Sequence, residues 1–430
     1  MRIAIVGTGI SGMTAAYHLQ AEHELTVFEA NGYIGGHTNT VDVELDGRSW
    51  AVDTGFIVFN DWTYPNFIAL MNELGVASQP SDMSFSVHCD RTGLEYCGSS
   101  LDQLFAQRRN LLSPGFYGMI ADIMRFNKES LDLLDTDDDS LSLGEYLEQG
   151  GYRQRFIEHY IIPMGAAIWS SSPASMYRFP ARYFVEFFSN HGMLNIKNRP
   201  TWRVIKGGSR AYVDKLVAGF ADRIHLNTPV EAVRRTDTGV TVHAGGTSAG
   251  FDAVLMACHS DQALRLLEDP DENELGILGA IPYQPNEAVL HTDTRLLPDR
   301  RKAWSAWNYH IPASDTGSVA LTYDMNILQS LDAPREFCVT LNHDDLIDES
   351  KILRRIAYEH PVYTPRGIAA QRRLGDINGS RRTFFAGAYW GFGFHEDGVK
   401  SGLAAVDAVR RWQHEGGNER DEQLPLRRAG

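Results

Sequence analysis

The first thirty residues place two short apolar runs on either side of a helical pattern. Residues 2–6 form an apolar run that ends at a glycine, and residues 25–29 form a second one. Between them, Ile10, Met13 and Tyr17 recur at helical spacing. This order predicts a strand, a helix and a second strand parallel to the first, which is how a parallel sheet covered by helices begins.

The rest of the chain changes pattern several times. Residues 66–150 mostly keep apolar positions at helical spacing, so a mainly helical segment is predicted there. Residues 224–257 read as short strands separated by turn residues, a meander that returns into a buried strand. A further buried strand is predicted at 383–387 and a helix at 402–412, before a polar tail at 413–430.

Composition excludes several classes of protein. The 430 residues suffice for two or three structural units, and the net charge of −15 disfavours nucleic-acid binding. The four cysteines form no CxxC pair and no histidines have zinc-ligand spacing, so we expect no metal site and a reducing, cytoplasmic location. The longest apolar run, at 160–169, is too short to span a membrane.

The turn after the first predicted strand carries glycines in a G-x-G-x-x-G pattern at residues 7–12. In such a turn Gly7 permits a tight reversal, Gly9 lets a pyrophosphate approach the backbone, and Gly12 lets helix and strand pack closely. The helix N-terminus offers free N–H groups to the phosphates. Glu29 ends the second strand, where a carboxylate can accept hydrogen bonds from ribose hydroxyls. These features together predict a dinucleotide site.

A second glycine pair indicates which dinucleotide binds. Gly35 and Gly36 come six and seven residues after Glu29 and are followed by His37. Bare glycine backbone gives a long cofactor room to lie against the chain, and NAD enzymes do not need this second clamp. The sequence therefore predicts FAD. No second G-x-G-x-x-G is present for NADPH, so electrons are expected to enter from the substrate and leave to oxygen or another acceptor.

Residues 1–60 resemble the flavin amine oxidase superfamily, which includes monoamine oxidases, protoporphyrinogen oxidases and carotenoid desaturases. Asp-Thr-Gly at 53–55 is similar to a flavin-proximal motif of that family. Residues 202–208 resemble the segment that leads to the adenine-side Val230, and residues 385–402 resemble its C-terminal flavin clamp. The resemblance implies an α/β fold: a Rossmann-like FAD-binding domain of the glutathione-reductase and amine-oxidase type, with an inserted α+β substrate domain.

The resemblance also implies domain limits and cofactor contacts. The FAD-binding domain is expected at 1–65, 200–260 and 370–412, and the substrate domain at 66–199 and 261–369. The residues expected to hold FAD are Gly7, Gly9, Ile10, Ser11, Gly12, Glu29, Ala30, Gly35, Gly36, His37, Gly55, Val230, Ala257, Gly387, Ala388, Gly398 and Val399. No cysteine lies near the C-terminal clamp, so the flavin is expected to be bound non-covalently.

Several departures weaken an amine-oxidase interpretation while leaving the flavin interpretation intact. His37 stands where the family often has arginine, and Ala388 where many members have glutamate. Phe394 replaces one of two tyrosines that flank the substrate in monoamine oxidases. Residues 283–287 lack the lysine that several members place near the flavin. Three segments, GGHTNT, AWNYH and AYWGFGFHEDG, look most like a bacterial group of predicted NAD/FAD-binding proteins associated with cyclopropane-fatty-acid-type methyltransferases.

Aromatic residues cluster in two stretches of the expected substrate domain. Phe184, Phe187 and Phe188 share a helical face, which fits either a core helix or the wall of a tunnel for an acyl or terpenoid chain. Trp304 and Trp307 mix with polar neighbours, as ligand pockets do, although core packing explains part of that run. We expect Trp304, Trp307, Phe184, Phe188 and Phe394 to line the substrate site.

Polar candidates for proton transfer are few. His395 and Tyr389 lie in the clamp segment, and Tyr309 lies in the tryptophan-containing stretch. Packing or cofactor binding explains these residues equally well. Separately, Arg108 and Arg109 precede a leucine pair, which fits either an ordinary surface loop or peripheral contact with a membrane.

Three functions stay open. The first is an FAD-dependent oxidoreductase that takes hydride from an apolar, lipid-like substrate by desaturation or oxidation, for example of a modified fatty-acyl chain. The second is a flavin amine oxidase that releases hydrogen peroxide. The third is a non-catalytic flavoprotein partner of a lipid-modifying methyltransferase. The sequence specifies neither the electron acceptor nor the oligomeric state.

Overall fold

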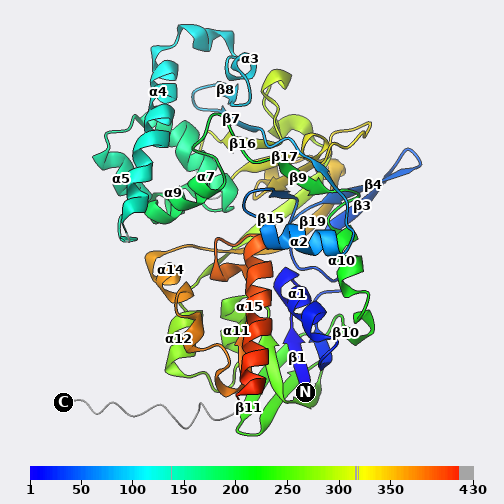
Figure 1. Ribbon diagram of the computed structural model, residues 1–430. Helices are drawn as coiled ribbons and strands as arrows, with labels where there is room; N and C mark the ends of the chain where they lie inside the picture. Colours follow the sequence, from blue (N-terminus) through cyan, green and yellow to red (C-terminus); the bar gives the residue numbers. More distant parts are fainter. Residues whose placement is uncertain (137, 315–316, 318, 416–430) are drawn as a thin grey trace, which may run out of the picture.

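The computed structural model describes residues 1–136, 138–314, 317 and 319–415. In Figure 1 a parallel sheet with its helices occupies the lower half of the molecule, and a larger sheet with a cluster of helices occupies the upper half. Among the described residues, no helix is both long and apolar enough to cross a bilayer. Part of the polar tail predicted at 413–430 lies outside the described residues.

A five-stranded sheet, in the order β10-β2-β1-β14-β20, forms the centre of the lower half. All four pairings are parallel, which confirms the predicted strand–helix–strand opening. The strands are β1 (Arg2–Val6), β2 (Glu24–Phe28), β10 (Ile224–His225), β14 (Ala253–Met256) and β20 (Thr383–Phe385). Helices α1 (Ile10–Leu19) and α15 (His395–His414) run side by side against this sheet.

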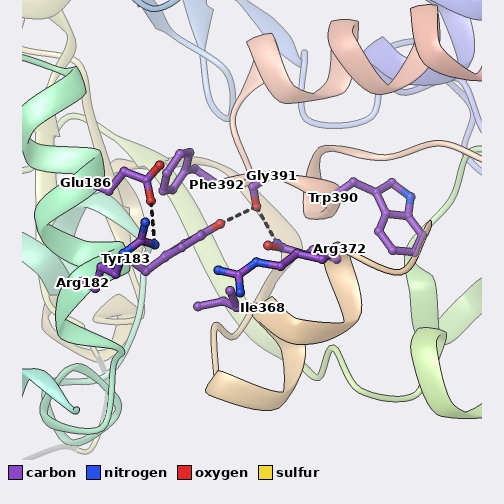
Figure 2. A pocket seen from close by; sticks show the side chains of 9 residues that line it. Arg182, Tyr183, Glu186, Ile368, Arg372, Trp390, Gly391 and Phe392 are labelled. Atoms are coloured by element: carbon purple, nitrogen blue, oxygen red, sulfur yellow. Dashed lines mark hydrogen bonds and ion pairs between the residues drawn. The ribbon is translucent and has the colours of Figure 1, made fainter. Parts of the chain in front are cut away.

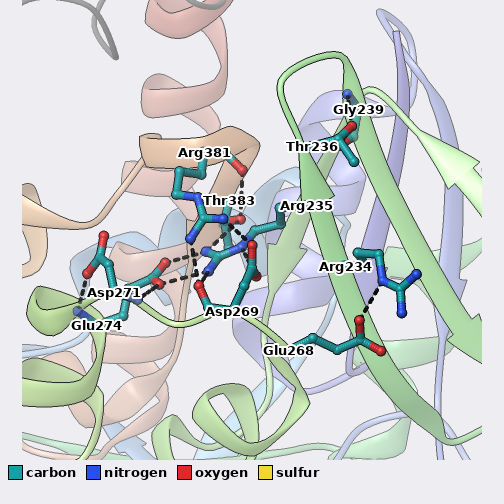
Figure 3. Close-up of polar contacts among 10 residues, drawn as sticks. All are labelled: Arg234, Arg235, Thr236, Gly239, Glu268, Asp269, Asp271, Glu274, Arg381 and Thr383. Carbon is teal, nitrogen blue, oxygen red and sulfur yellow. Dashed lines mark hydrogen bonds and ion pairs between the residues drawn. The ribbon is translucent and has the colours of Figure 1, made fainter.

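The predicted meander is present as a three-stranded antiparallel sheet. Its strands are β11 (Val230–Thr236), β12 (Gly239–Ala244) and β13 (Thr247–Phe251). Arg235 on β11 is buried, and its Nη2 donates to Glu274 Oε2 at 2.9 Å while its Nε donates to Asp269 Oδ1 at 3.0 Å (Figure 3). Because a buried charge needs a partner, this network fixes the meander to helix α12 (Glu272–Leu278).

A seven-stranded mixed sheet forms the upper half, in the order β19-β15-β18-β17-β16-β7-β8. Its strands are β7 (Phe85–Cys89), β8 (Leu94–Cys97), β15 (Tyr283–His291), β16 (Trp307–Ile311), β17 (Leu321–Asp324), β18 (Cys338–Leu341) and β19 (Ile352–Pro361). The helices beside it include α4 (Pro114–Glu129), α5 (Leu143–Gln149), α7 (Ile162–Ile168) and α9 (Ala181–Asn190). Their apolar faces share one aromatic core with the sheet. The expected α/β fold with a second, mixed α+β domain is confirmed.

Two small sheets join the halves, and they show that the helical prediction for 66–150 was wrong in part. β3 (Thr40–Leu45) pairs with β4 (Arg48–Asp53), and β9 (Trp202–Ile205) lies between β5 (Val58–Asn60) and β6 (Ser78–Pro80). β6, β7 and β8 therefore occupy a stretch predicted as helix. β6 pairs with β9 and β7 pairs with β16, partners that lie more than 100 residues away, so local periodicity carries little trace of those pairings; β8 pairs with its neighbour β7.

Two segments assigned to the substrate domain pack against the nucleotide-binding core instead. Phe67 and Leu70 of α2 (Pro65–Glu73) belong to the core beneath α1 and α15. Leu278 of α12, with α11 (Ser260–Leu266) before it, packs against the other face of the parallel sheet. This packing favours domain limits later in the chain than residues 65 and 260, and the limits themselves stay predictions.

Candidate FAD and substrate site

The glycine loop between β1 and α1 divides into structural and open positions. Gly7 has φ +107°, and a Cβ there would lie 2.7 Å from the carbonyl oxygen of Ala257. A Cβ at Gly12 would lie 2.2 Å from the oxygen of Gly7. A Cβ at Gly9 would meet nothing within 4 Å. Gly7 and Gly12 are thus required by the fold itself, whereas Gly9 leaves open space at the N-terminus of α1, which suits a pyrophosphate.

Glu29 is buried at the end of β2 and holds the loop in place. Its Oε2 accepts the N–H of Thr8 at 3.0 Å and the hydroxyl of Thr8 at 2.5 Å. Its Oε1 accepts the backbone N–H of Asn31 at 2.8 Å. Val230 starts β11, two residues after Thr228, whose N–H donates to the Glu29 carbonyl at 2.9 Å. The acid, the loop and the predicted adenine-side residue are therefore neighbours.

The second glycine pair folds onto the first. A Cβ at Gly36 would lie 3.2 Å from the Cα of Gly9, and the N–H of Gly35 donates to the Thr8 hydroxyl at 3.3 Å. Gly35 has φ +133° and Gly36 has φ +59°, backbone conformations that glycine adopts readily. His37, next in the chain, stacks on the ring of Tyr358 at 4.9 Å.

The C-terminal segment closes on the same helix. A Cβ at Gly398 would lie 2.5 Å from a methyl carbon of Ile10, and the N–H of Gly387 donates to the Ser401 hydroxyl at 3.0 Å. Val399, one turn into α15, is buried in the nucleotide core. Glycine backbone from three distant parts of the chain therefore meets around α1, an arrangement that fits FAD.

The remaining predicted cofactor residues follow the same geometry. Ala30, Ala257 and Ala388 come after β2, β14 and β20, at the carboxyl edge of the parallel sheet where nucleotides bind. Ser11 lies in the first turn of α1, and a Cβ at Gly55 would lie 2.2 Å from the carbonyl oxygen of His37. FAD bound by these residues would supply an isoalloxazine ring that can accept hydride.

His395 sits in a buried polar cluster at the start of α15. Its Nε2 lies 2.9 Å from the Thr38 hydroxyl and 3.0 Å from the Tyr212 hydroxyl, and its ring stacks on Phe56 at 3.4 Å. Burial lowers the pKa of His395 to about 3, so the imidazole is neutral near pH 7. A neutral ring can relay a proton through its hydrogen bonds but does not serve as a cationic acid at that pH.

The two tyrosine candidates lie in different elements. Tyr389 follows β20 in a 3-10 turn, packs edge-on to Tyr283 at 6.5 Å, and has its pKa raised by burial. Tyr309 is buried within β16 of the seven-stranded sheet. Their roles stay predictions, as does that of His395.

The predicted substrate-lining residues divide into two groups. Phe184 and Phe188 stack at 4.1 Å inside the aromatic core, where the core-helix interpretation placed them. Trp304 donates its Nε1–H to the Pro298 carbonyl at 2.7 Å, and Trp307 packs edge-on to a tyrosine ring at 4.9 Å. Phe394, by contrast, is partly exposed and stacks on a phenylalanine of α9 at 4.9 Å.

Two cavities adjoin the segment between β20 and α15. One, of about 330 Å³, is lined by Phe394 together with Trp62 and His191. The other, of about 440 Å³, lies between α9 and α14 (Pro365–Gln371) and is shown in Figure 2. There the Gly391 carbonyl accepts the Tyr183 hydroxyl at 2.9 Å. The lining residues of this second cavity are Arg182, Tyr183, Glu186, Ile368, Gln371, Arg372, Trp390, Gly391 and Phe392.

Sequence reasoning missed the polar network around Asp53. Its carboxylate accepts the Thr40 hydroxyl at 2.6 Å, the Ser209 N–H at 2.8 Å and the Gln329 amide at 3.0 Å. Burial raises the pKa of Asp53 to about 6, against the opposing effect of those hydrogen bonds. The network ties β4 to α10 (Arg210–Val217), and the Asp-x-Gly motif was its only trace in the sequence.

A cluster with metal-ligand chemistry also escaped the sequence. His88 and His310 stack at 4.2 Å across β7 and β16, and Asp90 lies 2.9 Å from His310 Nε2. One ligand atom from each residue lies within 4.8 Å of the others. Asp90 pairs with His310 Nε2, whereas the Nδ1 atoms of His88 and His310 are buried without a hydrogen-bond partner. Spacing rules could not find a cluster whose histidines lie 222 residues apart.

Comparison with known proteins places this geometry in a family. The family described as flavin containing amine oxidoreductase matches residues 10–319. A zeta-carotene desaturase of Synechocystis is 38% identical over 76 residues, which is 17% of this chain and only 15% of the desaturase. A Mycobacterium tuberculosis protein named for a flavin-containing monoamine oxidase is 26% identical over 355 residues, 75% of this chain and 70% of that protein.

Solved structures share the fold over almost the whole chain. Cyclohexylamine oxidase from Brevibacterium oxydans superposes with a TM-score of 0.69 at 16% identity, covering 96% of this chain and 99% of its own. A fatty acid isomerase from P. acnes that produces CLA superposes with a TM-score of 0.66 at 17% identity, covering 96% and 98%. The chain thus belongs to the flavin-containing amine oxidoreductase family, as an FAD-dependent oxidoreductase.

Proposed function

We propose that this oxidoreductase takes hydride from an apolar, lipid-like substrate, by desaturation or oxidation of a modified fatty-acyl chain. The observation that carries the proposal is the group of aromatic rings that line the two cavities beside the flavin clamp, where Lys400 also lines one cavity and Arg182 and Arg372 line the other. Phe394 stacks on Phe187 at 4.9 Å, and Phe392 packs against Phe187 at 5.5 Å and Tyr183 at 4.4 Å. Such a surface suits a hydrocarbon chain, because binding it removes apolar area from water.

The acids near this surface are already engaged. Glu396 accepts the N–H of Asn66 at 3.2 Å and of Phe67 at 2.9 Å, at the start of α2. Asp397 accepts the N–H of Phe394 at 3.0 Å. Burial raises the pKa of Asp397 to about 6, which reduces its value as a permanent anion. An alkylammonium substrate would therefore find weaker recognition here than an acyl chain would.

The names of the related proteins are compatible with either a lipid or an amine as the substrate. One structural neighbour is named as a fatty acid isomerase and another as cyclohexylamine oxidase, so this fold accommodates both substrate classes. The short match to a zeta-carotene desaturase adds a hydrocarbon precedent. Flavin amine oxidase activity is accordingly the second candidate, and the third is a non-catalytic partner of a methyltransferase.

Anaerobic flavin bleaching tests the proposal. The purified holoprotein is mixed without oxygen with phospholipids that carry unsaturated or methylated acyl chains, and separately with primary amines. We expect the yellow oxidised flavin to bleach with a lipid and to persist with the amines. Bleaching by amines, with peroxide released in air, would favour the amine oxidase. Persistence with every lipid, together with capture of a methyltransferase, would favour the partner role.

A variant pair locates the substrate surface. Phe394→Ala should slow bleaching by the lipid at least tenfold at unchanged flavin content, because it removes a ring from the cavity wall. Tyr177→Ala, at an exposed ring on α8 (Pro173–Tyr177), is the matched control and should bleach at the wild-type rate. Equal rates in Phe394→Ala and the wild type would remove this surface from the substrate path.

A further inference from the structure

Large apolar side chains gather on the surface of one end of the molecule. Leu112 is 88% exposed and Leu101 is 76% exposed, and Leu111 and Tyr117 beside them are about half exposed. They belong to α3 (Leu101–Leu104), the 3-10 turn η1 (Arg108–Leu112) and the first turn of α4. In Figure 1, α3 and α4 lie at the top, the end farthest from β1. Single exposed leucines are ordinary, but a contiguous group marks an interaction surface.

The leucines are presented by an ordered platform. Arg108 forms an ion pair with Asp102, which holds η1 against α3. The Tyr117 hydroxyl donates to the Leu111 carbonyl at 3.2 Å, which holds α4 against η1. Phe105 packs beneath, 5.9 Å from the ring of Tyr117. The exposed side chains are therefore fixed on one compact unit.

The charge around this platform is opposite to that of the whole chain. Residues 101–117, which form the platform, contain two basic residues and one acidic residue, in a chain whose net charge is −15. The acidic residue, Asp102, is paired with Arg108. Lys302 lies 2.7 Å from Asp102 and adds a further positive charge, and Arg109 is exposed beside the leucine pair. Apolar side chains with basic ones beside them fit a surface of hydrocarbon and anionic headgroups.

We propose that α3, η1 and the start of α4 dock this protein on an anionic phospholipid bilayer. Leu101, Leu111 and Leu112 enter the headgroup–acyl boundary, and Arg108 and Arg109 contact lipid phosphates. This inference concerns where the protein resides and does not depend on which substrate it oxidises. If the substrate is an acyl chain, the docked protein meets it where such chains are concentrated.

Vesicle flotation tests the surface directly. The full-length holoprotein is mixed with vesicles of phosphatidylcholine alone or of phosphatidylcholine with phosphatidylglycerol. Wild type should float with the anionic vesicles and less with the neutral ones, and salt should weaken binding because it screens the arginines. Leu112→Glu should bind at least tenfold more weakly, and Arg109→Ala about fivefold more weakly to anionic vesicles only.

The control is Leu275→Glu, at a leucine 50% exposed on α12, in the other half of the molecule. It should float like wild type. Because Leu112 is almost fully exposed, its substitution should leave flavin content and thermal stability unchanged, which confirms that the variant is folded. Wild type that stays in solution with both vesicles, or Leu112→Glu that floats like wild type, would overturn the proposal. Oxidation of detergent-dispersed lipid should be equal in Leu112→Glu and wild type. If neither protein oxidises the lipid, that result would contradict the proposed function and not the docking surface.

Discussion

Gly9 and Gly12 of the nucleotide loop should respond differently to the same added methyl group. Gly9 has φ −62° and ψ 170°, a conformation that alanine adopts freely, and a Cβ there meets nothing within 4 Å. Gly9→Ala should therefore fold normally, and reduced freedom of the unfolded chain should leave its free energy of unfolding unchanged or raised by about 0.4–1 kcal/mol. The methyl group instead occupies space that the pyrophosphate needs.

The expected loss is in FAD affinity. Pushing a phosphate away from one backbone N–H forfeits a hydrogen bond to a charged group, about 1.5–3 kcal/mol. That corresponds to a dissociation constant roughly 10- to 150-fold higher. Gly12→Ala differs because its Cβ would lie 2.2 Å from the Gly7 oxygen, so the helix must shift, at a cost of about 1–3 kcal/mol.

The assay separates the two effects. Apoprotein of each variant is prepared, its free energy of unfolding is measured in urea, and FAD is titrated back by fluorescence quenching. Gly9→Ala should lose affinity without losing stability, and Gly12→Ala should lose both. A Gly9→Ala protein that binds FAD as wild type does would show that the cofactor does not pass this glycine, and the argument for the loop would fail.

Three further predictions concern stability. Glu274→Ala should lower the free energy of unfolding by about 3–5 kcal/mol, because it leaves the buried Arg235 without one of its partners. The control, Glu268→Ala, removes an exposed ion pair and should cost no more than about 1 kcal/mol in the same urea titration. His395 should make the wild type lose stability relative to His395→Phe as pH falls from 6.5 toward 3, because the unfolded chain protonates this histidine first; equal pH profiles of the two proteins would refute its buried, neutral state. Asp53 makes the opposite contribution: between pH 3.8 and about 6 its raised pKa makes the folded state bind more protons, so the stability of the wild type relative to Asp53→Asn should fall as pH rises through that window.

The features predicted correctly from the sequence are those fixed by local chemistry. The loop at residues 7–12 needs glycine because φ at Gly7 is positive and because backbone crowds Gly12. Both reasons are local, so a short stretch of sequence is enough to predict the loop. The meander could likewise be predicted, because turn residues separate its short apolar runs. Such features require no knowledge of distant partners.

The features that escaped prediction depend on pairings across the fold. β7 pairs with β16, a partner about 220 residues away, and that pairing turned a segment expected as helix into sheet. The same pairing stacks His88 on His310. The hydroxyls that engage His395 come from Thr38 and Tyr212, which no spacing rule connects. Only the folded topology brings these groups together.

The position of His395 bears on how this site conducts its chemistry. Its neighbours include the two hydroxyls that share its Nε2, with the Thr38 and Tyr212 oxygens 2.5 Å apart. The Thr38 hydroxyl, the Tyr212 hydroxyl and His395 Nε2 each have hydrogen-bond partners within the cluster, so these hydrogen bonds orient the three side chains. The cluster lies at the start of α15, and Gly398 of this helix packs closely against α1. We therefore predict that His395 positions the clamp helix beside the nucleotide and does not itself take part in hydride removal.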